Sequence, residues 1–138
     1  MADKYLAAIV RHERAAQANS RLSREIGEAL GKCPVNVELG HWETTNARRA
    51  ELTAQDGRSK THVWMALNFT DIGSHGWPVR LHMDEIADYL AEDPVCEHCQ
   101  QAWQLVLQRK RVREELGNAK RAIRNIGRAA LAKEALHG

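Results

Sequence analysis

Three cysteines are the residues in this sequence whose type and spacing could do chemistry. Cys96 and Cys99 enclose two residues, a spacing that lets both thiolates reach one metal ion. Cys33 lies far earlier in the chain and brings the count to three, which does not suit a disulfide framework. We therefore predict that the three cysteines are ligands of a structural zinc ion.

A structural zinc ion takes four protein ligands, so the cysteines need one more partner. We predict His82, which precedes an expected short helix and lies 14 residues before Cys96. His98 sits between the two cysteines, where it is badly placed to bind the same ion. Other histidines of the middle segment stay open as alternatives: His41, His62 and His75.

Two other interpretations of the cysteines stay open. Free cysteine often behaves as a small apolar residue, so the thiols could simply be buried. A Cys-x-x-Cys pair can also do redox work, but this one lacks the strand and helix pattern of a thioredoxin-like site.

Two long helices must position the cysteines. Residues 3–31 and 94–136 each carry an apolar stripe at alternating steps of three and four, interrupted at His12, Asn19 and Arg109. If the helices pack antiparallel, the end of the first lies beside the start of the last, which brings Cys33 near Cys96 and Cys99. The stripe residues are Tyr5, Ala8, Ala15, Leu22, Ile26 and Ala29 in the first helix, and Ala102, Leu105, Val112, Leu116, Ala119, Ile123, Ile126 and Ala130 in the last.

The middle segment, residues 32–93, is less regular. We expect three tryptophans of this segment to form a small core: Trp42, Trp64 and Trp77. The expected elements are a helix at Thr44–Ala54, a strand at Thr61–Phe69, a loop at Ile72–Pro78 and a helix at Met83–Ala91. The predicted fold is mostly α: one domain, residues 1–138, forming a long antiparallel helical hairpin with a small irregular α+β insertion, clamped by zinc at one end.

Composition and charge narrow the classes of function. Apolar residues make up 43% of the chain and charged residues 28%, as in ordinary globular proteins. The longest apolar stretch is far shorter than the roughly 20 residues of a membrane span, and no secretory leader is evident, so we expect a cytoplasmic protein. Residues 1–99 hold 11 Lys/Arg and 15 Asp/Glu, net −4, whereas residues 100–138 hold 9 and 3, net +6.

The last helix carries a run of basic residues that could meet a partner. The candidate contact residues are Arg113, Lys120, Arg121, Arg124 and Arg128. Such a stripe suits a nucleic-acid backbone or an acidic protein surface, although a solvated helix face has the same pattern. Gly117 and Gly127 permit close helix approach, so a homodimer through this helix is a further expectation.

Catalytic motifs do not stand out. The sequence has no Gly-x-Ser-x-Gly, no phosphate-binding glycine loop and no His-Glu-x-x-His. Histidines and carboxylates of the middle segment could build a small metal-dependent nuclease, but their spacing does not require it. We therefore expect a binding protein and not an enzyme.

Three tracts resemble small uncharacterised accessory proteins of phages and prophages: Met83-Asp84-Glu85-Ile86, Cys96-x-His98-Cys99 and Gly117-x-Ala119-Lys120-Arg121-Ala122-Ile123-Arg124. The likeness covers about the last 55 residues and, more loosely, the first helix. It implies a phage accessory protein in the host cytoplasm and brings no assigned activity. Proteins of this class often bind a host protein, including defence machinery such as CRISPR effector complexes. The resemblance therefore implies host-protein binding and inhibition, whereas the basic residues of the last helix keep nucleic-acid binding as the alternative.

Overall fold

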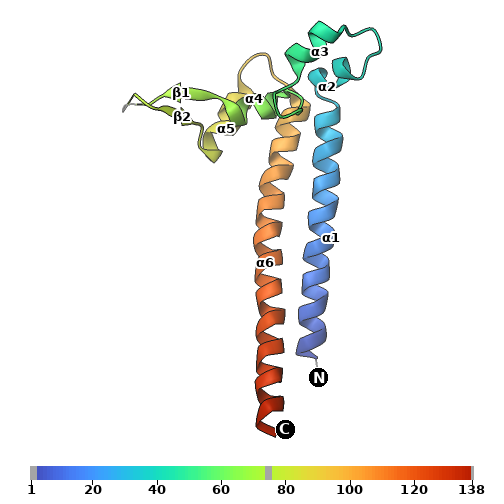
Figure 1. Cartoon of the computed structure of the whole chain (residues 1–138), viewed down its shortest axis with the longest axis vertical. Coiled ribbons are helices and arrows are strands. Elements are labelled where there is room, and N and C mark those ends of the chain that lie inside the picture. Colours follow the sequence, from blue (N-terminus) through green and yellow to red (C-terminus); the bar gives the residue numbers. More distant parts are fainter. Residues whose placement is uncertain (1–2, 74–75, 138) are drawn as a thin grey trace. The chain divides into compact units, whose positions relative to one another are not determined.

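A computed structural model describes residues 3–73 and 76–137 of the chain (Figure 1). By internal contacts the protein divides into two compact units. We call residues 25–105 the central unit, and residues 1–24 together with 106–138 the terminal unit. The prediction of one domain stays a prediction, because both long helices contribute residues to both units.

The two long helices are α1 (Lys4–Gly31) and α6 (Glu97–His137). The Asp3 carboxylate begins α1, since it accepts hydrogen bonds from the backbone N–H groups of Tyr5 (2.8 Å) and Leu6 (3.3 Å). Both helices match the predicted spans to within three residues at each end. The long helical hairpin predicted from the sequence is therefore confirmed.

In the terminal unit, α1 and α6 pack antiparallel. Contacts between the two helices pair rising numbers on α1 with falling numbers on α6. They join Arg11 to Glu115, Asn19 to Arg113 (3.1 Å) and Ser23 to Arg109 (3.2 Å). The predicted stripes supply buried side chains between them, namely Ala15, Leu22 and Ala119. Two of the polar residues that interrupt the stripes, Asn19 and Arg109, thus bond across the helix pair.

The central unit contains the end of α1, the start of α6 and the short elements between them. The helices are α2 (Pro34–Leu39), α3 (Asn46–Leu52), α4 (His62–Asn68) and α5 (Met83–Ala91). Strands β1 (Thr70–Ile72) and β2 (Pro78–Arg80) form an antiparallel pair with Thr70 opposite Arg80. The core of this unit contains Ile26, Ala29, Leu52, Val63, Ala66, Ile86, Leu90, Ala102 and Trp103.

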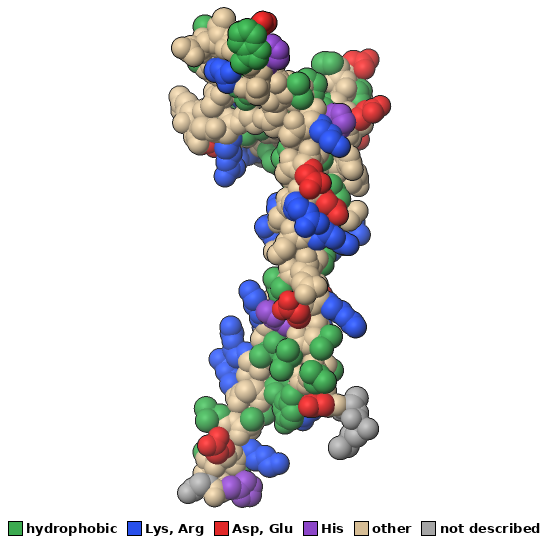
Figure 2. Space-filling model, turned by 90° about the vertical axis from the view of Figure 1, so that its right-hand side faces the viewer, with side chains coloured by type: hydrophobic (Ala, Val, Ile, Leu, Met, Phe, Trp, Pro, Cys, Tyr) green, Lys and Arg blue, Asp and Glu red, His purple; other side chains and the backbone are tan. Residues whose placement is uncertain are grey.

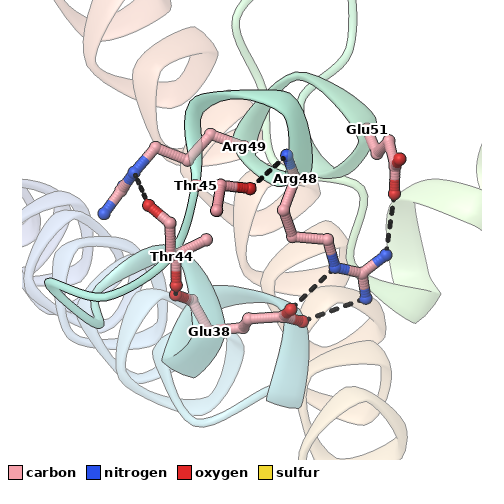
Figure 3. Close-up of polar contacts among 6 residues, drawn as sticks. All are labelled: Glu38, Thr44, Thr45, Arg48, Arg49 and Glu51. Atoms are coloured by element: carbon pink, nitrogen blue, oxygen red, sulfur yellow. Dashed lines mark hydrogen bonds and ion pairs between the residues drawn. The ribbon is translucent and has the colours of Figure 1, made fainter.

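A polar network fixes α2 and α3 relative to each other (Figure 3). Thr45 caps α3 by accepting a hydrogen bond from the Arg48 backbone N–H at 3.2 Å. The Arg48 guanidinium donates to both carboxylate oxygens of Glu38, at 2.7 and 3.1 Å, and also to Glu51. Arg49 donates to three backbone carbonyls of the segment that precedes α3. Such short helices are unstable alone, so these bonds help to hold them.

The predicted strand at Thr61–Phe69 is wrong, because this segment forms α4. The Thr61 hydroxyl accepts a hydrogen bond from the Trp64 backbone N–H at 3.1 Å, which is a helix N-cap. Val63 and Ala66, three residues apart, are the buried positions of the helix. Helical burial thus outweighs the β preference of the branched and aromatic residues. The helix at Met83–Ala91 is confirmed, whereas the sequence reasoning missed α2.

The predicted tryptophan core is also wrong. Trp42 and Trp77 are 83% and 70% exposed, and Trp64 is only partly buried. The tryptophan in the core is Trp103, on α6, at 2% exposure. The loop expected at Ile72–Pro78 is flanked by the two strands. Among the described helices, none combines the length and apolar character needed to cross a membrane.

Candidate metal centre

Four side chains of the central unit converge in the part of the chain that the structure describes. One potential ligand atom from each of them lies within 4.8 Å of every other: Cys33, His62, Cys96 and Cys99. The Nδ1 atom of His62 is 3.4 Å from the Cys33 sulfur and 3.8 Å from the Cys99 sulfur. All three cysteines are buried and the histidine is half-buried. The cluster can therefore hold an ion away from bulk water.

Each of these residues stands at the beginning of a helix. Cys33 is the N-cap of α2, whose first residue is Pro34, a favoured starting residue. His62 is the first residue of α4, directly after its Thr61 cap. Cys96 immediately precedes α6 and Cys99 lies in its first turn. Free backbone N–H groups at helix starts favour negative charge, which suits thiolate ligands.

Hydrogen bonds already polarise the sulfur atoms. The Cys99 backbone N–H donates to the Cys96 sulfur at 3.4 Å. The pKa of Cys33 is lowered, chiefly because the Cys99 thiol donates a hydrogen bond to its thiolate, despite the opposing effect of burial. The pKa of Cys99 is raised, because that same bond retains its proton and burial disfavours a second thiolate. A cation is what would compensate further thiolates in this space.

The distances from the His62 nitrogen to two of the sulfurs are close to those expected around a tetrahedral ion. An ion about 2.3 Å from sulfur and about 2.0 Å from nitrogen places tetrahedral ligands roughly 3.5–3.8 Å apart. The two sulfur–nitrogen separations above, 3.4 and 3.8 Å, lie close to this range. Three sulfurs and one imidazole nitrogen are a soft donor set, typical of Zn²⁺. Four protein ligands also complete the tetrahedron.

The structure brings together the three cysteines named from the sequence, but a different histidine joins them. His82, the preferred fourth ligand, lies outside the cluster as the N-cap of α5, where its backbone N–H donates to Glu85 at 2.9 Å. His62, one of the alternatives, takes the place. His41 stacks on Trp42, and His75 lies outside the described residues. His98, as expected, does not belong to the cluster.

A sequence signal for His62 was present in the residues around it. Thr61 precedes it, and apolar Val63 and Ala66 follow at helical spacing. If this pattern is interpreted as the start of a helix, His62 lies at the N-terminal end of that helix, as each cysteine does in its own helix. The strand interpretation concealed that likeness.

The predicted partner-binding residues all lie on the part of α6 in the terminal unit, and all are exposed: Arg113, Lys120, Arg121, Arg124 and Arg128. Two of them make local contacts, Arg113 with Asn19 and Arg121 with Asn118. The terminal unit holds 14 Lys/Arg and 5 Asp/Glu, a net charge of +9. The central unit holds 6 and 13, a net charge of −7. The two units thus differ by 16 charges.

Comparisons with known proteins gave no match to a protein-family model, a curated protein or a solved structure.

Proposed function

We propose that this protein is a zinc-stabilised, non-enzymatic phage accessory protein that binds a host protein. The phage context comes from the resemblance of the Met83–Ile86, Cys96–Cys99 and Gly117–Arg124 tracts. Support for zinc comes from the soft donor set, its burial and the close approach of its four donor atoms. In this role the ion stabilises the fold and contributes no reaction.

The observation that carries a binding function is the display of large apolar side chains by the central unit. Trp42 exposes 83% of its surface and Trp77 exposes 70%. Val37 and Ile72 are also more than half exposed, at 60% and 74%. Tryptophan is enriched among the residues that dominate binding energy in protein interfaces, because it buries a large area with few rotatable bonds. Exposed tryptophans on a clamped scaffold favour a protein partner, of which a host defence complex is one class.

A catalytic role fits the cluster poorly. Catalytic zinc sites keep one coordination position for water or substrate, whereas here four protein side chains are available. The fourth position would have to be vacated before a substrate could bind. This is why we favour binding over metal-dependent hydrolysis.

The experiment that tests the proposal is capture of a host protein by the immobilised full chain. Nuclease-treated lysate of candidate bacterial hosts is passed over the protein, and retained proteins are identified by mass spectrometry. Each identified protein is then purified, and its dissociation constant is measured by calorimetry. We expect one stoichiometric partner, bound at least about tenfold more weakly by Trp42→Ser or Trp77→Ser.

Leu136→Ser is the matched control, because Leu136 is 85% exposed but lies in the terminal unit. It should leave the affinity unchanged. A partner that binds every variant equally, or the lack of any stoichiometric partner, would contradict the proposal.

Nucleic-acid binding is a second candidate, favoured by the charge of +9 on the terminal unit. A quadruple replacement of Arg113, Lys120, Arg124 and Arg128 by glutamine should then abolish binding to duplex DNA or RNA. Binding should also fall steeply as salt rises, since neutralised phosphates release counterions. The control is Arg58→Gln with Lys60→Gln, which removes charges from the central unit. A host-protein complex that survives the quadruple change would remove support for this candidate.

A further inference from the structure

The terminal unit carries an apolar groove between α1 and α6. The groove measures about 670 Å³. Its apolar lining consists of Leu6, Ala7, Val10, Ala15, Ala18 and Val112. Figure 2 shows hydrophobic side chains gathered on the lower part of the molecule, with Lys and Arg side chains beside them. Leu6 is 58% exposed and Val10 37%, so both can be covered by a partner.

The spacing of the lining residues suits a helix. Leu6 and Val10 are four residues apart and form a ridge along α1, while Ala7 and Ala18 leave room beside it. Ridges at this spacing pack into the grooves of another helix. The neighbouring Ile9, 57% exposed, extends the apolar surface of α1. Aliphatic lining without an aromatic ring offers nucleic-acid bases nothing to stack on.

The charges around the groove specify the partner further. Asp3 is engaged in capping α1, and Arg11 is paired with Glu115. Arg14, which also lines the groove, makes no ion pair within residues 3–73 and 76–137. It stands in a unit of net charge +9. A second copy that presented its own terminal unit would bring another +9 against this face and be repelled, whereas carboxylates would be attracted.

We propose that this groove is the docking site for an amphipathic α-helix of a protein partner, with leucine-type residues on one face and Asp or Glu on its flanks. The inference rests on the proposed function, because it names the chemistry of the host protein's contact segment. Leucines of the partner helix pack between Leu6, Val10 and Val112. One flanking carboxylate of that helix meets Arg14.

The test uses the full chain and a fluorescein-labelled probe peptide of about 18 residues, which gives five helical turns. The peptide carries leucine at helical spacing and glutamate on the flanks, and a second peptide has lysine in place of glutamate. Fluorescence anisotropy should show saturable binding of the glutamate peptide and at least about tenfold weaker binding of the lysine peptide, since like charges meet in the second case.

Three variants locate the site. Val10→Glu and Leu6→Ser should each weaken binding of the glutamate peptide about tenfold or more, because they place polar groups in the apolar contact. Ser20→Glu adds the same charge to α1 as Val10→Glu but lies outside the groove lining, and should change affinity less than about threefold. Circular dichroism and metal content, equal to those of the parent, confirm that each variant is folded. Arg14→Glu should reduce the preference for the glutamate peptide.

Several outcomes would overturn the inference. One is equal binding of both peptides, and another is binding that Val10→Glu and Leu6→Ser leave intact. A third outcome is displacement of the probe by duplex DNA, together with equally tight DNA binding by Val10→Glu and the parent. That result would assign the surface to nucleic acid. A dimer in sedimentation that Val10→Glu dissociates would assign the groove to a second copy. A captured host protein that is sensitive to Trp42→Ser but not to the groove variants would leave the proposed function standing and refute this inference alone.

Discussion

In the central unit, four helices of six to nine residues meet the ends of α1 and α6 around a buried cysteine and histidine cluster, with a net charge of −7. In the terminal unit, two long helices pair through alanines and leucine, and the net charge is +9. Short helices cannot persist without tertiary support, whereas a long amphipathic pair supports itself by packing. The short helices of the central unit therefore depend on contacts around the cysteine and histidine cluster, whereas the long pair depends on its own apolar stripes.

The largest expected effect is the loss of a fully buried ligand. Cys99→Ser should remove bound metal and destabilise the protein by more than about 3 kcal/mol, since binding of structural zinc contributes folding free energy. Metal content by mass spectrometry and thermal unfolding by circular dichroism measure the two changes. Leu22→Ala is the control from the terminal unit. It should cost about 2–5 kcal/mol through the cavity left at Leu22 but retain the metal. Full metal content in Cys99→Ser would refute the assignment.

The second effect separates two histidines that both begin short helices of the central unit. His62→Ala should lower metal affinity strongly, because it removes one of four ligands. His82→Ala should keep the metal and change the stability by less than about 0.5 kcal/mol, because its bond to Glu85 uses the backbone N–H, which alanine retains. A competition titration against a zinc chelator gives both affinities. If His82→Ala proves the more damaging to metal binding, the ligand set described above is incorrect.

The smallest effect concerns an exposed ion pair of the terminal unit. Arg11 donates a hydrogen bond to Glu115 and holds the pKa of that carboxyl below its ordinary value. The pair therefore stabilises the fold above the unfolded pKa of about 4.3 and loses this contribution as pH falls through the lower folded pKa. Arg11→Gln should return the pKa of Glu115 toward its ordinary value. Carboxyl chemical shifts followed by NMR measure it, and an unchanged pKa would show that the pair does not form in solution.

Much of the fold could be predicted because it depends on periodicity. The apolar stripes fix both long helices, and their antiparallel pairing brings Cys33 to Cys96 and Cys99 without further information. The fourth ligand could not be fixed by this route, because the middle segment offers four candidate histidines and only the local path of the chain selects one. The helix cap at Thr61 places His62 at the start of α4. The composition of this segment favours a strand instead, so the position of His62 could not be predicted. The prediction of a tryptophan core failed for a different reason. It relied on the general tendency of tryptophan to be buried, and Trp42 and Trp77 are exposed.

The terminal unit is assembled from segments that are distant in sequence, with 104 residues separating Arg11 from Glu115, whereas the central unit is one continuous segment. Synthesis proceeds from the amino terminus, so the central unit is complete before the later part of α6. A cluster closed on an ion would join Cys33 to Cys96. The contact of Ser23 with Arg109 then closes a loop of roughly 23 residues in place of 86, which lowers the entropic cost by about 1 kcal/mol. If the cluster binds an ion, the order of synthesis lets the nascent chain bind it before the later part of α6 pairs with α1.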